Sequence, residues 1–271
     1  MFESLRHRFA LAAALVRLEF INNLAYRATY FTGVFNYGIQ IGAYYFLWDA
    51  VFAGRRLLAG FTREEMLTYV IVAWVVRSFY FSNLDRRVAV EIRNGDIAME
   101  LILPYDYQEA KYCRAFGEAL FRLLFFTLPT GIVIYLLRPF QLPPNFTAGF
   151  LFILSMLGSF LINAQLSLMA GLLAFFTQST SGIYRAKRVI MDLCTGLLIP
   201  ISFYPEWFQK VLAFLPFQAV SYLPNLIYLG KVDTAGALAV LARQFFWAVV
   251  LFFLGRLFWR LAVRHLVIQG G

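Results

Sequence analysis

The sequence is poor in charged residues and in histidine. Charged side chains make up 14% of the 271 residues, against about 25% in a typical soluble domain, so there is too little polar surface to cover a water-soluble globule of this size. Only two histidines occur, His7 and His265, at opposite ends of the chain, which argues against imidazole catalysis and a histidine-rich metal site. These deficits exclude a cytosolic enzyme.

Cysteine is equally scarce. The two cysteines, Cys113 and Cys194, lie in or beside different hydrophobic runs, so a disulfide framework is not expected and both are interpreted as buried free thiols. The basic residues, which give a net charge of +9, are scattered at the ends of hydrophobic runs. A nucleic-acid partner would require them on one solvated face, so no such partner is expected.

Motifs for energy supply and catalysis are also missing. No G-x-x-x-x-G-K-[ST] loop is present to hold the phosphates of ATP, and no G-x-S-x-G turn, H-E-x-x-H helix or close carboxylate pair lies within a hydrophobic run. Asp49 and Asp192 lie near the ends of such runs, so a proton-driven pump is not indicated. We expect no cofactor or metal bound by this chain and no catalytic residue.

Apolar residues, by contrast, make up 61% of the sequence, against about 45 to 50% in soluble domains. A spanning helix needs about 20 mostly apolar residues. The pattern predicts an all-α membrane protein with six transmembrane helices in a single domain, 1–271. The spans are expected at about 28–52, 66–84, 115–137, 146–176, 189–203 and 239–263.

The N-terminal segment 1–24 is not predicted to span. Its apolar residues recur at helical spacing, but charged residues, among them Arg17 and Glu19, interrupt them, as in an amphipathic helix lying in the membrane interface. The alternative is a cleaved signal peptide. Its apolar core, 9–16, would be short and followed at once by these charges, so the interfacial helix is the preferred interpretation.

Segment 204–238 is apolar enough to suggest a seventh span, but Pro205, Pro216 and Pro224 interrupt it and Lys210 adds a charge. An uninterrupted spanning helix is therefore excluded. We expect a re-entrant outer hairpin of two short amphipathic helices, packed on the bundle because backbone at membrane depth must be shielded from lipid. Their apolar faces would be Trp207, Val211 and Phe214, and Val220, Leu223 and Ile227.

The distribution of Lys and Arg predicts the orientation. Fifteen lie on the side of the two termini: Arg6, Arg8, Arg17, Arg27, Arg86, Arg87, Arg93, Lys111, Arg114, Arg185, Lys187, Arg188, Arg256, Arg260 and Arg264. Six lie on the other side: Arg55, Arg56, Arg63, Arg138, Lys210 and Lys231. Basic loops stay in the cytoplasm, so both termini are expected to be cytoplasmic, which agrees with an even number of spans.

The loop 85–112 between the second and third spans is the most informative segment. Residues 88–93 can form a short helix, which Asn94 and Gly95 would end in a left-handed cap. A loop with such a defined helix end is more ordered than a simple connection between two spans needs to be. The loop is therefore interpreted as a docking surface, and the alternative is a helix that only lies on lipid head groups.

A second short helix is expected directly after this cap. Asp96 can cap its first turn, and the helix over 97–103 would stop before Pro104, because the residue before a proline disfavours the helical conformation. The two helices together form a rigid, amphipathic cytoplasmic segment about 20 residues long, and this shape supports the docking interpretation.

Two stretches of the chain carry a resemblance. The first is IRNGDI at 92–97 followed by LILP at 101–104, and the second is IPISFYPEW at 199–207 followed by LPFQ at 215–218 and by YLP…LG within 222–230. The first is similar to the I-x-x-G-x-[LI]…L-x-x-P pattern between spans two and three of type-2 ABC transporter permeases. The second resembles the segment after span five in the six-span exporter subunits of that family.

The resemblance implies a permease subunit of an ATP-binding-cassette exporter in the bacterial inner (cell) membrane. Separate ATPase subunits would bind ATP and magnesium and meet a cytoplasmic coupling helix, and a second permease, identical or related, would complete the path among the membrane lipids. The alternatives are a secondary transporter or channel not driven by ATP, and a membrane-bound lipid-modifying enzyme.

The resemblance also implies roles for two sets of residues. The coupling residues would be Arg86, Arg87, Glu91, Ile92, Arg93, Asn94, Gly95, Asp96, Ile97, Leu101 and Pro104. The outer-hairpin residues would be Pro200, Pro205, Trp207, Pro216, Phe217 and Pro224.

Few polar residues lie deep in the spans, and the pair in span one has two interpretations. Asn36 and Gln40 share a helix face, and Gly38 and Gly42 form a G-x-x-x-G that permits close helix approach. The pair would either stabilise helix packing or line a translocation path.

Charged residues near the inner ends of spans two and three have the same ambiguity. Arg77 is a further candidate for the path, but its side chain can also extend to the membrane interface. Glu118 is four residues from both Arg114 and Arg122 and can neutralise one of them. These residues are therefore interpreted first as structural pairs and second as groups for substrate or coupling.

Overall fold

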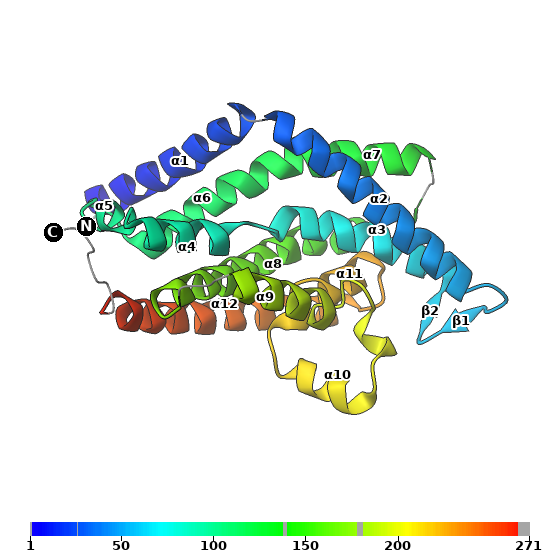
Figure 1. Cartoon of the computed structure of the whole chain (residues 1–271). Coiled ribbons are helices and arrows are strands. Elements are labelled where there is room, and N and C mark those ends of the chain that lie inside the picture. The colour runs from blue at the N-terminus through cyan, green and yellow to red at the C-terminus, as the bar shows by residue number, and fades with distance from the viewer. Residues whose placement is uncertain (1, 26, 138–139, 178–180, 265–271) are drawn as a thin grey trace.

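The computed structural model describes residues 2–25, 27–137, 140–177 and 181–264. The described chain forms a bundle of long helices with one antiparallel β-hairpin (Figure 1). The longer helices are α1 (Phe2–Ala25), α2 (Arg27–Val51), α3 (Arg63–Tyr80), α6 (Tyr107–Arg122), α7 (Leu128–Leu137), α8 (Phe146–Leu172), α9 (Ser181–Cys194) and α12 (Thr234–Val263). The shorter elements are β1 (Leu57–Leu58), β2 (Phe61–Thr62), α4 (Leu84–Asn94), α5 (Ile97–Leu101), α10 (Glu206–Ala213) and α11 (Tyr222–Tyr228).

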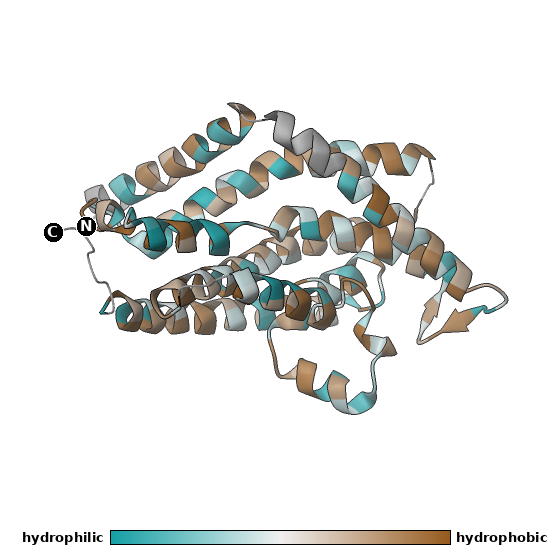
Figure 2. Cartoon of the chain, viewed as in Figure 1, coloured by the Kyte–Doolittle hydropathy of each residue, from teal (hydrophilic) through white to brown (hydrophobic). Residues whose placement is uncertain are grey.

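The two ends of the bundle carry different elements. The start of α1, helix α5 and the end of α12 lie together at one end, whereas β1 and β2 lie at the other (Figure 1). We call residues 86–104 the elbow, and the two ends the elbow end and the hairpin end. Hydrophilic residues are concentrated on α4, and α7 is mainly apolar (Figure 2).

Four helical segments among the described residues are long and apolar enough to cross a bilayer: Arg63–Asn94, Tyr107–Leu137, Phe146–Phe175 and Thr234–Val263. The pair Glu206–Ala213 and Phe217–Tyr228, bent by 77°, could count as a fifth. The chain is therefore an all-α membrane protein, as predicted. The number of six spans stays a prediction, and so does the crossing of the bilayer by α2.

The fifth predicted span is wrong in its bounds. A helix was expected over about 189–203, but α9 occupies Ser181–Cys194 and its 14 residues extend about 21 Å, less than the hydrocarbon core. Gly196 then adopts a left-handed conformation with φ of +79°. Pro200 restricts the residue before it to extended backbone, so the chain continues only as a short 3₁₀ turn at Ile201–Phe203.

The third predicted span begins earlier than expected. Its helix starts at Tyr107, because the Asp106 side chain accepts a hydrogen bond of 2.9 Å from the backbone N–H of Glu109 and so caps the first turn. The helix continues to Leu137 through a π-helical turn at Leu123–Thr127. The loop predicted over 85–112 is therefore mostly helical, and only the residues around α5 connect one helix to the next.

Glycines allow two other helices to lie close to α8. A Cβ at Gly171 would lie 2.8 Å from the backbone oxygen of Asp85 on α4, and a Cβ at Gly158 would lie 2.6 Å from the side-chain oxygen of Gln244 on α12. Gln244 in turn donates to the backbone carbonyl of Ser155 at 3.0 Å. Helix α8 is therefore the centre on which α4 and α12 pack.

The predicted N-terminal helix is present as α1, and it packs along α6. A Cβ at Gly117 of α6 would overlap the backbone carbonyl of Val16, so the two helices are in close contact. Phe9 and Leu18 of α1 are 74% and 52% exposed. Helix α1 thus has one face on the bundle and leaves apolar side chains outside, which suits its predicted position in the membrane interface.

The outer hairpin has the two short helices that the prolines predicted, but only one packs as expected. In and beside α11, Val220 and Ile227 are buried at 0% and 1% exposure. The apolar face of α10 was also expected on the bundle, yet Trp207 and Phe214 are 68% and 79% exposed. That part of the prediction is wrong: α10 projects from the bundle (Figure 1) and leaves this face uncovered within the chain.

Candidate functional site

The elbow is the segment in which the backbone can be compared most directly with the predicted helix caps. Helix α4 ends at Asn94, and Gly95 has φ of +79° with its N–H donating to the carbonyl of Ile92 at 3.3 Å. This is the predicted left-handed cap. The second cap is different, because Asp96 is in the right-handed helical region and makes no side-chain cap hydrogen bond. Helix α5 instead starts with the N–H of Ala98 donating to the carbonyl of Gly95 at 3.0 Å.

One face of the elbow is anchored in the core. Val88, Ala89 and Ile97 are 0%, 1% and 0% exposed, and Ile92 packs against the same hydrophobic cluster. These contacts pack the elbow on α8, so one of its sides is anchored within the chain.

The other face of the elbow is exposed and partly apolar. Met99 and Ile102 are 66% and 74% exposed, and Leu101 is 39% exposed. The predicted residues Arg86, Arg93, Asn94, Gly95, Asp96 and Pro104 are exposed as well. Exposed apolar side chains next to polar ones are typical of a surface that binds another protein or a membrane.

A group of ion pairs around the buried Glu118 connects the elbow to α1 and α6. Glu118 of α6 is 4% exposed and pairs with both Arg87 of α4 and Arg122 of its own helix. Arg87 also pairs with Glu19 of α1 at 2.5 Å. The sequence predicted that Glu118 neutralises Arg114 or Arg122, and Arg122 is confirmed. The contact with Arg87 could not be read from the sequence, because Arg87 lies on a different helix.

A second group of charges connects the elbow to the start of α6. Lys111 is 2% exposed, and its Nζ lies 2.7 Å from Glu91 and 3.5 Å from Glu100, while Arg114 lies 2.9 Å from Glu100. Burial of Glu100 raises its pKa, but the charges of Lys111 and Arg114 outweigh burial, so the pKa is lowered. The Tyr107 hydroxyl donates to Glu91 at 3.0 Å.

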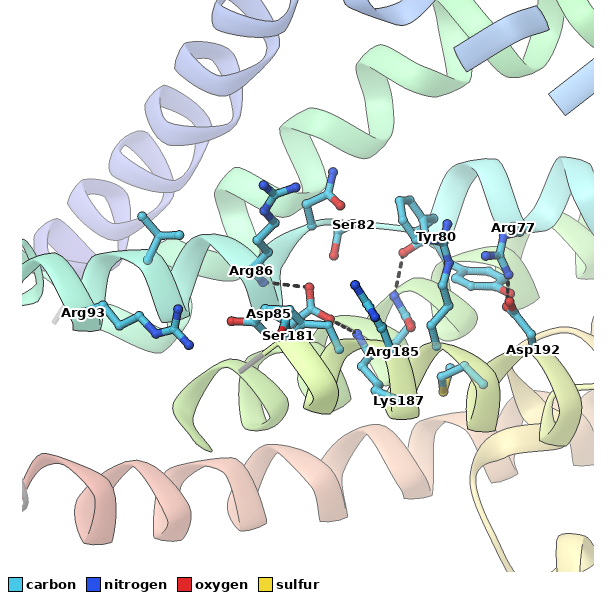
Figure 3. Close-up of a pocket in the computed structure, with 17 residues that line it drawn as sticks. Arg77, Tyr80, Ser82, Asp85, Arg86, Arg93, Ser181, Arg185, Lys187 and Asp192 are labelled. Carbon is cyan, nitrogen blue, oxygen red and sulfur yellow. Dashed lines mark hydrogen bonds and ion pairs between the residues drawn. The ribbon is translucent and has the colours of Figure 1, made fainter. Parts of the chain in front are cut away.

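Helix α9 is joined by one ion pair to the root of the elbow and by another to α3. Lys187 lies 2.8 Å from Asp85 and 2.6 Å from the Ser167 hydroxyl, and Arg77 pairs with Asp192 (Figure 3). Asp85 and Lys187 are 102 residues apart in the sequence. The only sequence signal for such pairs is that charges in a very apolar chain need partners, and that signal does not identify the partner.

The three candidates for the translocation path do not lie together. Arg77 is buried and paired with Asp192, as the structural interpretation predicted. Asn36 and Gln40 are exposed on α2, away from the Tyr37 ring, which contacts Trp74 at a centroid distance of 5.4 Å. Within this chain, the asparagine and the glutamine therefore face outward.

The glycines beside this pair have no close neighbour. A Cβ at Gly38 or Gly42 would meet no other described atom within 4 Å. The close helix approach that the G-x-x-x-G pattern permits is not seen among the described residues, so a packed helix at this place stays a prediction.

The residues predicted for the outer hairpin are divided between the core and the surface. Pro200, Pro216 and Pro224 are buried, Phe217 is half-buried, and Pro205 and Trp207 are exposed. Pro205 precedes the first residue of α10, and Pro224 lies in the first turn of α11, where the missing proline N–H costs no helical hydrogen bond. Pro205 and Pro224 thus set the starts of α10 and α11.

The model of the ABC-2 family of transporter proteins matches residues 39–270, a range that includes the elbow, the outer hairpin and α12. No curated protein sequence gives a significant match. The matched range covers most of the chain, so the chain belongs to the ABC-2 family of transporter proteins.

Proposed function

We propose that this ABC-2 permease is the membrane subunit of an ATP-driven exporter and that separate ATPase subunits bind the exposed face of the elbow. The observation that carries the proposal is the two-sided elbow. Val88 and Ile97 are buried on one side, and Met99 and Ile102 are exposed on the other. A segment that is rigidly anchored within the chain and open to a partner can transmit force between them.

The ion pairs support the transmission of such a force. Glu118, Arg87 and Glu19 connect the elbow to α6 and α1, and Asp85 and Lys187 connect its root to α9. A displacement of the elbow by ATP-driven closure of the ATPase pair would move these helices together. Alternating access would follow from rocking of the spans about the interface between two permease subunits.

A second permease, identical or related, would cover α2. Asn36 and Gln40 face outward beside glycines that have no close neighbour. Polar side chains that face lipid without a partner are unfavourable, whereas small residues let a second helix approach. We infer that this face of α2 meets the partner permease and that the polar pair borders the path there.

The orientation follows from charge. The elbow lies at the same end as the start of α1 and the end of α12 (Figure 1), and the sequence assigns most of the Lys and Arg residues to the side of the termini. We propose that this end faces the cytoplasm of a bacterial cell, with the protein in the inner membrane. ATP and magnesium would then be bound by the partner ATPase on the same side.

The test is substitution of Gly95 by valine in the assembled transporter. Gly95 has φ of +79°, and a Cβ would meet nothing within 4 Å, so the cost of about 1–2 kcal/mol comes from the left-handed backbone alone. We expect less ATPase subunit to co-purify with Gly95→Val and a lower rate of substrate-stimulated ATP hydrolysis.

The matched control is Gly54→Val at the hairpin end. Gly54 has φ of +76° and also has nothing within 4 Å of a Cβ, so the backbone strain is the same but the elbow is untouched. The control should keep ATPase binding and hydrolysis. Full activity of Gly95→Val would contradict the coupling role, and transport that continues without any ATPase would favour a secondary transporter or channel.

A further inference from the structure

A cavity of about 560 Å³ lies at the root of the elbow, between the break that separates α3 from α4 and one side of α9 (Figure 3). We propose that this cavity binds a phosphate group carried by the transported molecule, so that the cargo is an anionic amphiphile. The inference rests on the proposed transport function and adds the chemical class of the cargo.

The walls of the cavity carry an excess of positive charge. The basic residues are Arg77, Arg86, Arg93, Arg185, Lys187 and Arg188, and the acids are Asp85 and Asp192. Both acids are already paired, Asp192 with Arg77 and Asp85 with Lys187. In the described part of the chain, Arg185 and Arg188 form no ion pair with a carboxylate. The cavity therefore keeps cationic groups after its own acids are neutralised.

Two buried hydroxyls in the same cavity lack a hydrogen-bond partner among the described residues. Ser82 is 4% exposed and its Oγ is unpartnered, and the buried hydroxyl of Tyr184 is unpartnered too. Buried polar groups without partners are unfavourable, and oxygen atoms of a ligand would remove this penalty. Guanidinium groups beside hydroxyl donors suit the oxygens of a phosphate group.

The apolar part of the cavity wall indicates why the phosphate should belong to an amphiphile. Phe81, Val90 and Met191 line the cavity together with Arg185 and Arg188, and Val90 is 45% exposed. A phosphate held by the arginines would place an attached apolar chain along the three apolar residues. A free phosphate ion would use only the basic part of the site and would leave the apolar part uncovered.

A ligand bound in the cavity would also contact the helix that leads into the elbow. Asp85, Arg86 and Val90 of α4 line the cavity opposite α9. A bound phosphate would therefore bridge α9 and α4, the helix that continues through Gly95 into α5. Binding of the cargo should thus stimulate ATP hydrolysis by the assembled transporter, because the same helix would contact both the cargo and the ATPase.

The experiment measures binding to the full-length permease, without an ATPase, in lipid nanodiscs made of neutral lipid. The probes are a short-chain phosphatidic acid and inorganic phosphate. We expect saturable binding of the phosphatidic acid, with inorganic phosphate at least about tenfold weaker. The double variant Arg185→Gln/Arg188→Gln should weaken binding of the phosphatidic acid by about tenfold or more, since each arginine contributes charged hydrogen bonds.

Two further variants make the result specific. Arg55→Gln/Arg56→Gln removes the same charge from exposed residues at the hairpin end and should leave binding unchanged. Ser82→Ala keeps every charge and should weaken binding severalfold, with a thermal unfolding temperature close to that of the unmodified protein. If Ser82→Ala and Arg185→Gln/Arg188→Gln both bind phosphatidic acid normally, the site is refuted.

Other outcomes also decide the proposal. Equal losses in Arg55→Gln/Arg56→Gln and in Arg185→Gln/Arg188→Gln would mean general charge attraction and would overturn the site. Equal affinity for inorganic phosphate and phosphatidic acid would overturn the amphiphile assignment. Because binding is measured on the permease alone, it is independent of coupling: a permease that binds phosphatidic acid but acts with no ATPase keeps this site and loses the proposed function.

Discussion

The elbow end and the hairpin end of the bundle are ordered by different interactions. At the elbow end, buried charges connect segments far apart in the sequence, as Glu118 connects Arg87 and Arg122. At the hairpin end the ion pairs are more exposed, as in Lys231 with Glu65 at 21% and 22% side-chain exposure. Aromatic rings also connect distant segments there: Phe203 lies 5.0 Å from Trp48 and 6.4 Å from Phe61 between ring centroids.

The two kinds of contact differ in how strictly they fix the relative position of the segments they join. A buried ion pair is favourable only when both partners stay in place, so it fixes the relative position of two helices. Aromatic contacts add about 0.5–1.5 kcal/mol each beyond area burial and permit several arrangements, so they can hold irregular backbone such as the segment around Gly196. The elbow end is therefore suited to transmitting movement, and the hairpin end to closing the bundle.

The largest effect on stability is expected for Glu118→Gln at the elbow end. The change leaves the buried Arg122 and the partly exposed Arg87 without their shared carboxylate, and removal of one partner of a buried pair costs about 3–5 kcal/mol. Thermal unfolding in detergent should show a large decrease in the unfolding temperature. The control is Glu109→Gln, because the Glu109 side chain is 46% exposed and exposed pairs contribute under about 1 kcal/mol. Equal decreases in the two variants would show that burial of the ion pairs at the elbow end does not determine their contribution to stability.

A smaller effect is expected for Tyr69→Phe at the hairpin end. The buried Tyr69 hydroxyl donates to the carbonyl of Gly196, and its loss leaves that carbonyl unsatisfied at a cost of about 1–3 kcal/mol. Tyr204→Phe is the control, because the Tyr204 hydroxyl also donates to a backbone carbonyl, at 3.2 Å, but in an exposed position. Chemical denaturation should separate the two variants, and a neutral Tyr69→Phe would show that aromatic packing alone orders this end.

A modest pH dependence is expected from Glu100. The lowered pKa of Glu100 means that its contribution to stability is present above its ordinary value of about 4.5 and is lost as the pH falls through the lowered value. Glu100→Gln should therefore reduce the stability difference between pH 7 and acidic pH. Glu64→Gln, an exposed change at the hairpin end, should leave the difference unaltered. An identical pH profile for Glu100→Gln and the unmodified protein would contradict the role of Lys111 and Arg114.

The smallest effect on stability, with a clear effect on assembly, is expected for Ile102→Ser. Ile102 is 74% exposed on the elbow, and Leu142 is 63% exposed in the loop between α7 and α8. Either change to serine should alter stability by less than about 0.5 kcal/mol. Only Ile102→Ser should reduce co-purification of the ATPase. A comparable reduction with Leu142→Ser would show that apolar exposure in general, and not the elbow, governs assembly.

Local sequence determined much of the fold. The shortage of charge and the apolar runs fixed the membrane class, since such a chain cannot cover itself with polar surface. Gly95 predicted the left-handed helix end, because glycine takes positive φ without strain. Pro205, Pro216 and Pro224 predicted the short outer helices for an equally local reason, the missing N–H and fixed φ of proline.

Tertiary structure alone decided which charges pair, which faces are covered and where cavities form. Arg77 and Asp192 are 115 residues apart in the sequence, and only the packing of α9 against α3 brings them together. The sequence gives both α10 and α11 an apolar face, yet only the face of α11 is buried. Helix periodicity shows which residues share a face, but it does not show what covers that face. The cavity beside Ser82 exists for the same reason: it depends on the distance between two helices, which no local pattern encodes.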